Sequence, residues 1–93
     1  MNVEVQYEVK ISGRVQGVGF RYYVKERADK FNIRGWVKNL SDGSVGVTAC
    51  GEEVEMESFL DHLRRGPSLA RVTHIAIHKI SEPVSFDDFS VKY

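Results

Sequence analysis

Hydrophobic and polar residues alternate along the first dozen positions of the chain. The apolar positions of this segment are Val3, Val5, Tyr7, Val9 and Ile11. Successive side chains of a β-strand point to opposite faces, so this alternation predicts a strand with one buried and one exposed face.

After a glycine-rich stretch the period of the pattern changes. Phe20, Val24, Ala28 and Phe31 recur at steps of three and four residues, which is the spacing of one face of an α-helix. The pattern therefore predicts an amphipathic helix over about residues 21–32.

The middle of the chain predicts a β-hairpin. Residues 34–40 are expected to form a second strand, and residues 45–49 a third strand that ends at Gly51. Between them lies Asp42-Gly43, a pair that readily adopts the left-handed backbone of a tight β-turn.

The last third of the chain predicts a helix and two strands. Residues 52–65 carry apolar residues at helical spacing, and Gly66-Pro67 ends this helix. Residues 71–81 predict a fourth strand in which the apolar positions change phase, and a β-bulge at an unassigned position is one explanation of the change. Residues 89–93 predict a short closing strand.

This order of elements predicts a ferredoxin-like α+β sandwich, β-α-β-β-α-β with a short extra C-terminal strand. Two helices are expected on one face of an antiparallel sheet, in a single domain over residues 1–93. In this topology the first two strands run in the same direction with the third between them, about 10 Å apart. Asn39, near the end of the second strand, should then share one sheet edge with the glycine-rich turn and Arg21.

Composition and charge exclude several functions. The 93 residues carry 13 basic and 13 acidic side chains, so no net field favours nucleic acid or an anionic membrane surface. No apolar run reaches membrane-spanning length, and the N-terminus lacks the apolar stretch of a leader. The single cysteine forms no internal disulfide, which favours a reducing compartment. We expect a cytoplasmic monomer.

The glycine-rich stretch over residues 13–21 is the strongest candidate for chemistry. Gly17 and Gly19 allow a backbone that brings amide groups close to a ligand, and the free donors at the start of the next helix add to them. Arg21 lies at the same point and offers a planar fork of donors to phosphate. A Walker loop and a dinucleotide fingerprint both lack a required residue here. A phosphate cradle and a plain connecting turn remain as the two interpretations.

Other candidate groups favour structural roles. Cys50 has no evident base partner and is interpreted as a small core or strand residue. His74 and His78 share a strand face without a third ligand, so no metal site is expected. His62 is interpreted as a solvated surface residue, and Tyr22 and Tyr23 as packing or rim residues.

Two segments resemble the signatures of the acylphosphatase family. The segment Gly-Arg-Val-Gln-Gly-Val-Gly-Phe-Arg over residues 13–21 is similar to Gly-x-Val-Gln-Gly-Val-x-Phe-Arg. The segment Gly-Trp-Val-Lys-Asn-Leu-Ser-Asp-Gly-Ser-Val over residues 35–45 is similar to Gly-Trp/Tyr-Val-x-Asn-x-x-Asp-Gly-x-Val. Neither segment departs from its signature, and the resemblance extends over essentially the whole chain.

The resemblance implies hydrolysis of the carboxyl–phosphate bond of small acyl phosphates, without metal or organic cofactor. It implies that Arg21 is the phosphate-binding catalytic arginine and that Asn39 orients the attacking water, whose proton passes to a phosphate oxygen of the substrate. The substrate-binding amide loop would consist of Gln16, Gly17, Val18, Gly19 and Phe20.

Two other functions are weighed against this one. Ferredoxin-like sheets also serve as non-catalytic anion-binding or nucleic-acid-binding modules, although the basic and aromatic run of an RNA-binding sheet is missing here. Acylphosphatase-like domains also occur fused to hydrogenase-maturation carbamoyltransferases. The length of this chain favours a stand-alone enzyme.

Overall fold

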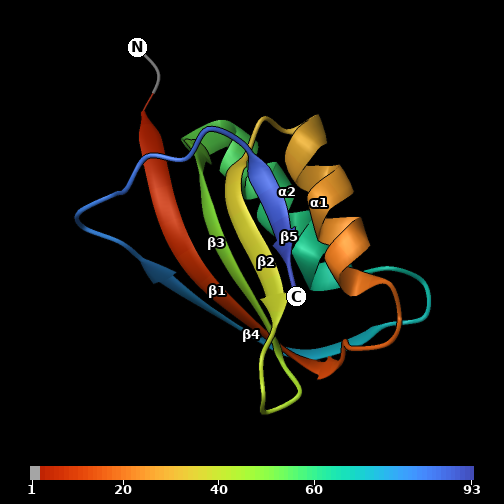
Figure 1. The fold of residues 1–93 in the computed structure, drawn as a ribbon. Coiled ribbons are helices and arrows are strands. Elements are labelled where there is room, and N and C mark those ends of the chain that lie inside the picture. The colour runs from red at the N-terminus through yellow and green to blue at the C-terminus, as the bar shows by residue number, and fades with distance from the viewer. Residues whose placement is uncertain (1–2) are drawn as a thin grey trace.

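Seven elements follow one another in the order that the hydrophobic pattern predicts (Figure 1). The computed structural model describes residues 3–93, so the first two residues of the predicted domain lie outside it. The elements are β1 (Glu4–Arg14), α1 (Phe20–Lys30), β2 (Arg34–Asn39), β3 (Val45–Glu52), α2 (Glu53–Arg65), β4 (Arg71–Lys79) and β5 (Phe89–Lys92). The predicted ferredoxin-like sandwich is confirmed.

The strands form one sheet in the order β4-β1-β3-β2-β5. Pairings within β4-β1-β3-β2 are antiparallel, but β5 pairs parallel with β2. The sheet is therefore mixed, and the prediction of a wholly antiparallel sheet is wrong in this respect. The reason is the path of the chain: after β4 it crosses one end of the sheet, and so it enters β5 at the end where β2 begins (Figure 1).

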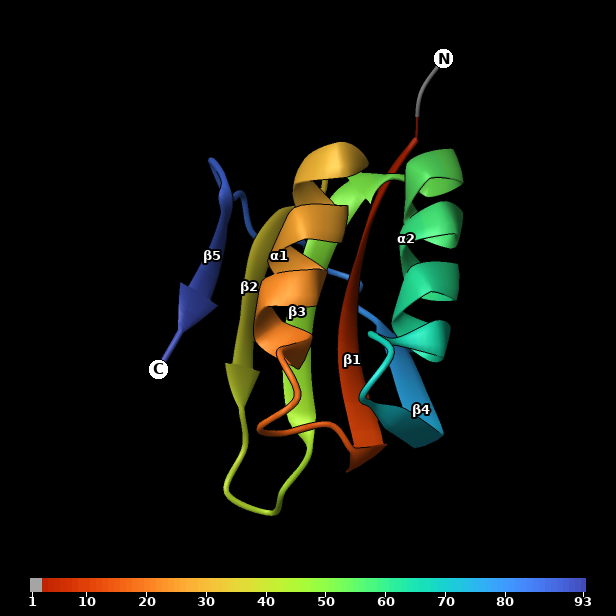
Figure 2. The same ribbon diagram turned by 90° about the vertical axis from the view of Figure 1, so that its right-hand side faces the viewer.

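Both helices cover the same face of the sheet (Figure 2). Phe20, Val24 and Ala28 of α1 are buried there, as the helical spacing predicts. From α2 the buried residues are Met56, Phe59, Leu60 and Leu63. The strands complete the core mainly with valines and alanine, and β3 is buried along all but its last residue because it lies in the middle of the sheet.

The predicted bulge lies near the start of β4. Ser12 pairs with His74, whereas Gly13 pairs with Val72, so Thr73 is the additional residue. Gly13 and the residue after it thus belong to β1, and the turn that follows is shorter than the sequence predicts. Because the bulge reverses the alternation, Val72 and Ile75 both pack against the core.

The sheet face opposite the helices is partly covered by the connection between β4 and β5 (Figure 1). Gln6, which the alternation predicts to be exposed, is buried under this segment. Its Oε1 accepts a hydrogen bond from the Val84 amide at 2.8 Å, and its carbonyl accepts one from the Ile80 amide at 2.9 Å. Beyond this segment the face is partly open, and Lys10 and Lys38 are exposed there.

Phe59→Ala should lower the free energy of unfolding by about 3–5 kcal/mol. The Phe59 ring is fully buried and packs edge-on against Phe89 at 6.2 Å between centroids, so truncation leaves a cavity between α2 and β5. Urea unfolding followed by circular dichroism measures the change. Val54→Ala on the exposed side of the same helix is the matched control, with a change within about 0.5 kcal/mol; equal losses in the two variants would contradict this view of the core.

Candidate active site

The turn over residues 15–19 leads from β1 into α1. Gly17 and Gly19 adopt φ angles of 73° and 78°, in the left-handed region where a side chain would be strained. Gly19 is the residue that precedes the helix, and no side chain caps the first amides. The first turn of α1 holds no acidic residue. The free N–H groups and the positive end of the helix dipole therefore form a place that suits an anion.

The side chain of Gln16 fastens this turn to the connection between β2 and β3. Its Nε2 donates to the carbonyl oxygens of Leu40 and Ser44, at 2.9 Å each. These two bonds hold the turn against the end of β2. The Gln16 side chain is thus engaged in positioning the turn.

The connection that accepts these bonds is itself fixed by Asp42. Its Oδ1 accepts hydrogen bonds from the Ser44 amide at 3.0 Å and the Ser44 hydroxyl at 2.5 Å, and its Oδ2 lies 2.7 Å from Lys10 Nζ. Lys10 first, and then the Ser44 donors, hold the pKa of the Asp42 carboxyl well below its usual range. The β2–β3 turn is therefore anchored to β1.

Arg21 extends from the first turn of α1 toward β5. Its Nη1 donates to the carbonyl oxygen of Lys92 at 3.2 Å, and its Cζ lies 4.6 Å from the centroid of the Tyr93 ring. One hydrogen bond leaves most of the guanidinium donors available to a ligand. The last two residues thus orient the arginine. None of the ion pairs with aspartate or glutamate found among residues 3–93 involves Arg21, so its charge stays available.

These elements surround a cavity of about 160 Å³. Of the predicted site residues, Gly17, Gly19, Phe20, Arg21 and Asn39 line it, whereas Gln16 and Val18 do not. The remaining lining residues are Val15, Tyr22, Val91 and Tyr93. Arg21 and Asn39 therefore meet at one cavity, as the topology predicts.

Sequence reasoning missed the part of β5 in this cavity. The alternation of residues 89–93 predicts a strand, but it does not reveal which strand that segment pairs with. Val91 pairs with Val37 of β2, and this parallel pairing brings Tyr93 to the sheet edge beside Arg21. Tyr22, interpreted as a packing or rim residue, is 78% exposed at the same cavity, which supports the rim position.

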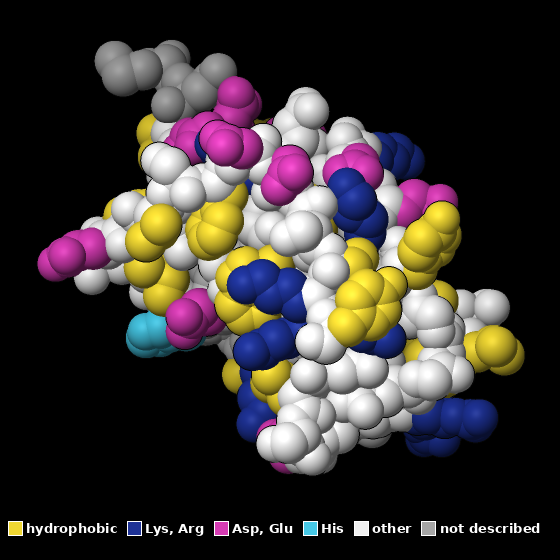
Figure 3. Space-filling view, in the orientation of Figure 1, with side chains coloured by type: hydrophobic (Ala, Val, Ile, Leu, Met, Phe, Trp, Pro, Cys, Tyr) yellow, Lys and Arg dark blue, Asp and Glu magenta, His cyan; other side chains and the backbone are white. Residues whose placement is uncertain are grey.

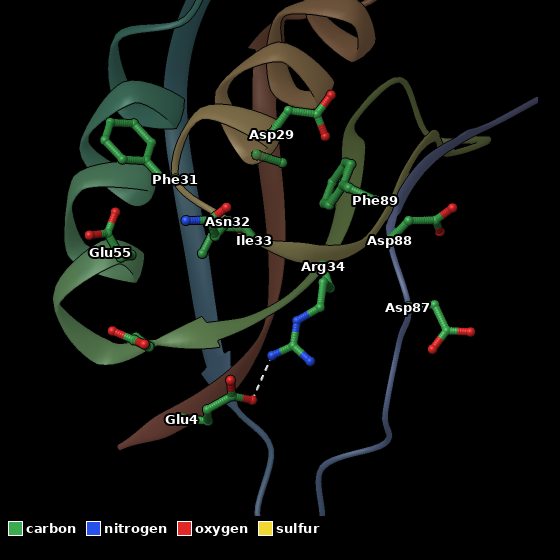
Figure 4. Close-up of a pocket in the computed structure, with 12 residues that line it drawn as sticks. Glu4, Asp29, Phe31, Asn32, Ile33, Arg34, Glu55, Asp87, Asp88 and Phe89 are labelled. Atoms are coloured by element: carbon green, nitrogen blue, oxygen red, sulfur yellow. Dashed lines mark hydrogen bonds and ion pairs between the residues drawn. The ribbon is translucent and has the colours of Figure 1, made fainter. Parts of the chain in front are cut away.

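A larger cavity of about 460 Å³ lies at the other end of the sheet (Figure 4). Its acidic lining residues are Glu4, Asp29, Glu52, Glu55, Asp87 and Asp88. Its one basic lining residue, Arg34, pairs with Glu4 at 2.6 Å. So many carboxylates repel a phosphate group, and the smaller cavity beside Arg21 is the one suited to an anion.

The remaining candidates take structural positions. Cys50 is buried beside Arg34, and burial raises the pKa of its thiol, which fits the interpretation as a strand residue. His62 is half-buried against the Phe31 ring, so it is less exposed than the sequence predicts, and burial lowers the pKa of its imidazole. Residues 3–93 contain no cluster of histidine, cysteine or acidic side chains able to hold a metal ion.

A βαββαβ sandwich with glycine-rich backbone and an arginine around one small cavity defines a compact α+β domain with a site suited to an anion. The chain belongs to the acylphosphatase family, whose family model matches residues 7–91. An acylphosphatase from Archaeoglobus fulgidus is 42% identical over 96% of this chain and 99% of its own length, and one from Bacillus licheniformis is 39% identical over the same shares. The crystal structure of acylphosphatase from Bacillus subtilis superimposes with a TM-score of 0.93 at 40% identity, covering 96% of this chain and 99% of that one.

These similarities confirm the resemblance found in the two signatures. They favour an acylphosphatase enzyme over a non-catalytic binding module. Within residues 3–93, neither helix has the length and apolar character needed to span a membrane.

Asp42→Asn should lower stability at neutral pH, and its difference from the parent should shrink as the pH falls below about 4. Because the folded protein holds the pKa of Asp42 below its usual range, the stabilisation is fully present above the usual aspartate pKa. It is lost as the pH falls through the lower pKa of the folded state. Urea unfolding of both proteins at neutral, mildly acidic and strongly acidic pH measures the difference. A difference that stays constant over this range would contradict the assignment.

Proposed function

We propose that this acylphosphatase hydrolyses the carboxyl–phosphate bond of small acyl phosphates in the cavity beside Arg21. The observation that carries the proposal is that Arg21 and Asn39, 18 positions apart on different elements, line one cavity with the glycine turn. The volume of about 160 Å³ suits a phosphoryl group with a small acyl group attached.

The phosphoryl group is bound by main-chain amides of residues 16–20 and by the Arg21 guanidinium. The positive end of α1 points at the same place. Lys92 and Tyr93 hold the guanidinium in position before the substrate arrives. Preorganised donors of this kind neutralise the charge on the equatorial oxygens, which is the main requirement of phosphoryl transfer through a loose transition state.

Asn39 orients the attacking water at the end of β2. Its side-chain oxygen accepts a hydrogen bond from the water, and its NH₂ group can donate to the phosphate or to the water. The water attacks phosphorus in line with the acyl oxygen, the bond between that oxygen and phosphorus breaks, and the carboxylate leaves. A carboxylate is a good leaving group, so it needs no strong general acid.

The proton of the attacking water passes to an oxygen of the substrate's own phosphoryl group. An asparagine carboxamide cannot take a proton at neutral pH, and among the described residues no histidine, aspartate or glutamate side chain lines the cavity. The products are the free carboxylate and inorganic phosphate. Neither a metal ion nor an organic cofactor has a step in this mechanism.

We further propose that the chain acts as a single domain over residues 1–93, as a monomer in the cytoplasm and without a nucleic-acid partner. Equal numbers of acidic and basic residues support the absence of a polyanionic partner, and the single cysteine supports a reducing compartment. Phosphate release from benzoyl phosphate, measured with and without a chelator, tests the proposed function. A rate abolished by the chelator would contradict the metal-free mechanism.

Arg21→Ala should reduce kcat/KM for benzoyl phosphate by at least 10²–10³-fold, roughly the effect of removing one preorganised donor. Arg21→Lys should also fail, because lysine retains the charge and loses the planar fork. Phosphate release and competitive inhibition by inorganic phosphate measure turnover and phosphate affinity. Arg65→Ala, on the exposed side of α2, is the matched control and should keep the parent rate; a fully active Arg21→Ala protein would disprove the role of Arg21.

Asn39→Ala should retain the affinity for inorganic phosphate and lose turnover, by about 10²–10³-fold. The carboxamide is proposed to hold the water and not the phosphoryl group, so kcat should fall while the inhibition constant of phosphate changes little. Steady-state kinetics with benzoyl phosphate measures both. Parent-like kcat in this variant would rule out water positioning by Asn39.

A further inference from the structure

The open face of the sheet carries a groove that the catalytic mechanism does not use. It has a volume of about 500 Å³, within the range of small-molecule sites. The groove is deep at its centre because the residues there, Gly46, Thr48 and Ala76, have small side chains. Trp36 and Leu40 form one wall. Glu8, Lys10 and His78 supply polar groups on the other strands.

Two lysines converge on the tryptophan at this wall. Lys38 Nζ lies 5.4 Å and Lys92 Nζ 4.8 Å from the centroid of the Trp36 ring. In Figure 3, dark-blue side chains lie against hydrophobic ones near the middle of the visible face, where Figure 1 shows β2. Neither lysine lines the groove itself, but both contact the Trp36 ring that forms its wall, so an exposed cationic pair lies at the rim of the groove.

The pairing of the strands makes this cationic pair unusual. Lys38 and Lys92 are directly opposite each other on the parallel strands β2 and β5, and like charges in that position repel. Lys10 of β1 lies in the same row of residues across the sheet, but its charge is paired: its Nζ is 2.7 Å from Asp42 Oδ2. Among the described residues, neither Lys38 nor Lys92 forms an ion pair with a carboxylate. An anionic ligand would supply the negative charge that these two lysines lack.

We propose that this groove binds an aromatic phosphate of the nucleoside monophosphate class. The planar base stacks on Trp36, and the phosphate accepts charge-assisted hydrogen bonds from the ammonium groups of Lys38 and Lys92. The lysines exchange their contacts with the ring for contacts with the phosphate, and the repulsion between them is relieved. Glu8 and His78 offer hydrogen-bonding groups at the far wall.

The observations favour a mononucleotide over a nucleic-acid strand. The groove has a single tryptophan as its stacking surface, whereas proteins that bind single strands stack successive bases on several aromatic rings. The acidic residues at the far end of the sheet, among them Glu4 and Asp88 (Figure 4), would repel a strand that continued in that direction. A compact ligand with one base and one phosphate fits better.

The groove and the catalytic cavity lie on different sides of β2. Lys38 and Asn39 are neighbours in this strand, so their side chains point to opposite faces of the sheet. Asn39 lines the catalytic cavity, and Trp36 lines the groove. Nucleotide binding should therefore leave the catalytic cavity accessible, and it is a function separate from acyl phosphate hydrolysis.

Fluorescence of Trp36 tests the proposal, because it is the only tryptophan of the chain. Adenosine monophosphate, with correction for its absorbance, should quench the emission in a saturable way. Ribose 5-phosphate, which has the phosphate and no base, should bind at least tenfold more weakly. Lys38→Gln and Lys92→Gln should each weaken nucleotide binding about fivefold or more, whereas Lys79→Gln, an exposed lysine at the end of β4, should not. Urea unfolding checks that each variant is folded.

Several results would overturn the proposal. Equal binding of ribose 5-phosphate would show that only the phosphate is recognised, and parent-like binding in both lysine variants would place the nucleotide elsewhere. Competitive inhibition of benzoyl phosphate hydrolysis, with an inhibition constant equal to the fluorescence dissociation constant, would place it in the catalytic cavity. Affinity that rises with the length of a single-stranded oligonucleotide would indicate a strand-binding surface instead. Non-competitive or absent inhibition supports the separate groove, and the hydrolysis assay with Arg21 variants remains an independent test of the catalytic proposal.

Discussion

The pairing of β3 between β1 and β2 is the constraint on which the rest of this structure depends. Because both pairings are antiparallel, β1 and β2 run in the same direction and end at the same edge of the sheet. The turn after β1 and Asn39 at the end of β2 are thereby brought together. The buried residues of β3 make this register hard to change, since a shift by one residue would turn its apolar side chains to the other face.

At this edge of the sheet, polar contacts hold the neighbouring backbone segments in position. Gln16 ties the glycine turn to the β2–β3 connection, and Asp42 ties that connection to Lys10 on β1. From the other side, β5 supplies the carbonyl and the ring that orient Arg21. In the proposed mechanism the phosphoryl group is bound largely by backbone amides, and these bind an anion only when the segments that carry them are fixed.

Charge is distributed unevenly although the chain as a whole is neutral. Acidic residues gather around the cavity beside Arg34 at one end of the sheet, while the cavity at the other end has Arg21 and the positive end of α1. On the open face of the sheet, Lys38 and Lys92 form a second cluster of positive charge. Net charge alone therefore says nothing about small anions, which respond to local geometry.

The sequence by itself determined the order of elements, the helical stripes, the change of phase in β4 without the place of its bulge, and the meeting of Arg21 with Asn39. These follow from local periodicity and from a topology with few alternatives. Only the tertiary structure decided that β5 runs parallel to β2, that Tyr93 lies beside Arg21, that Gln6 is buried, and that the Gln16 side chain fastens the turn. Each of these depends on which distant segment a residue meets, and periodicity along the chain carries no information about the partner across space.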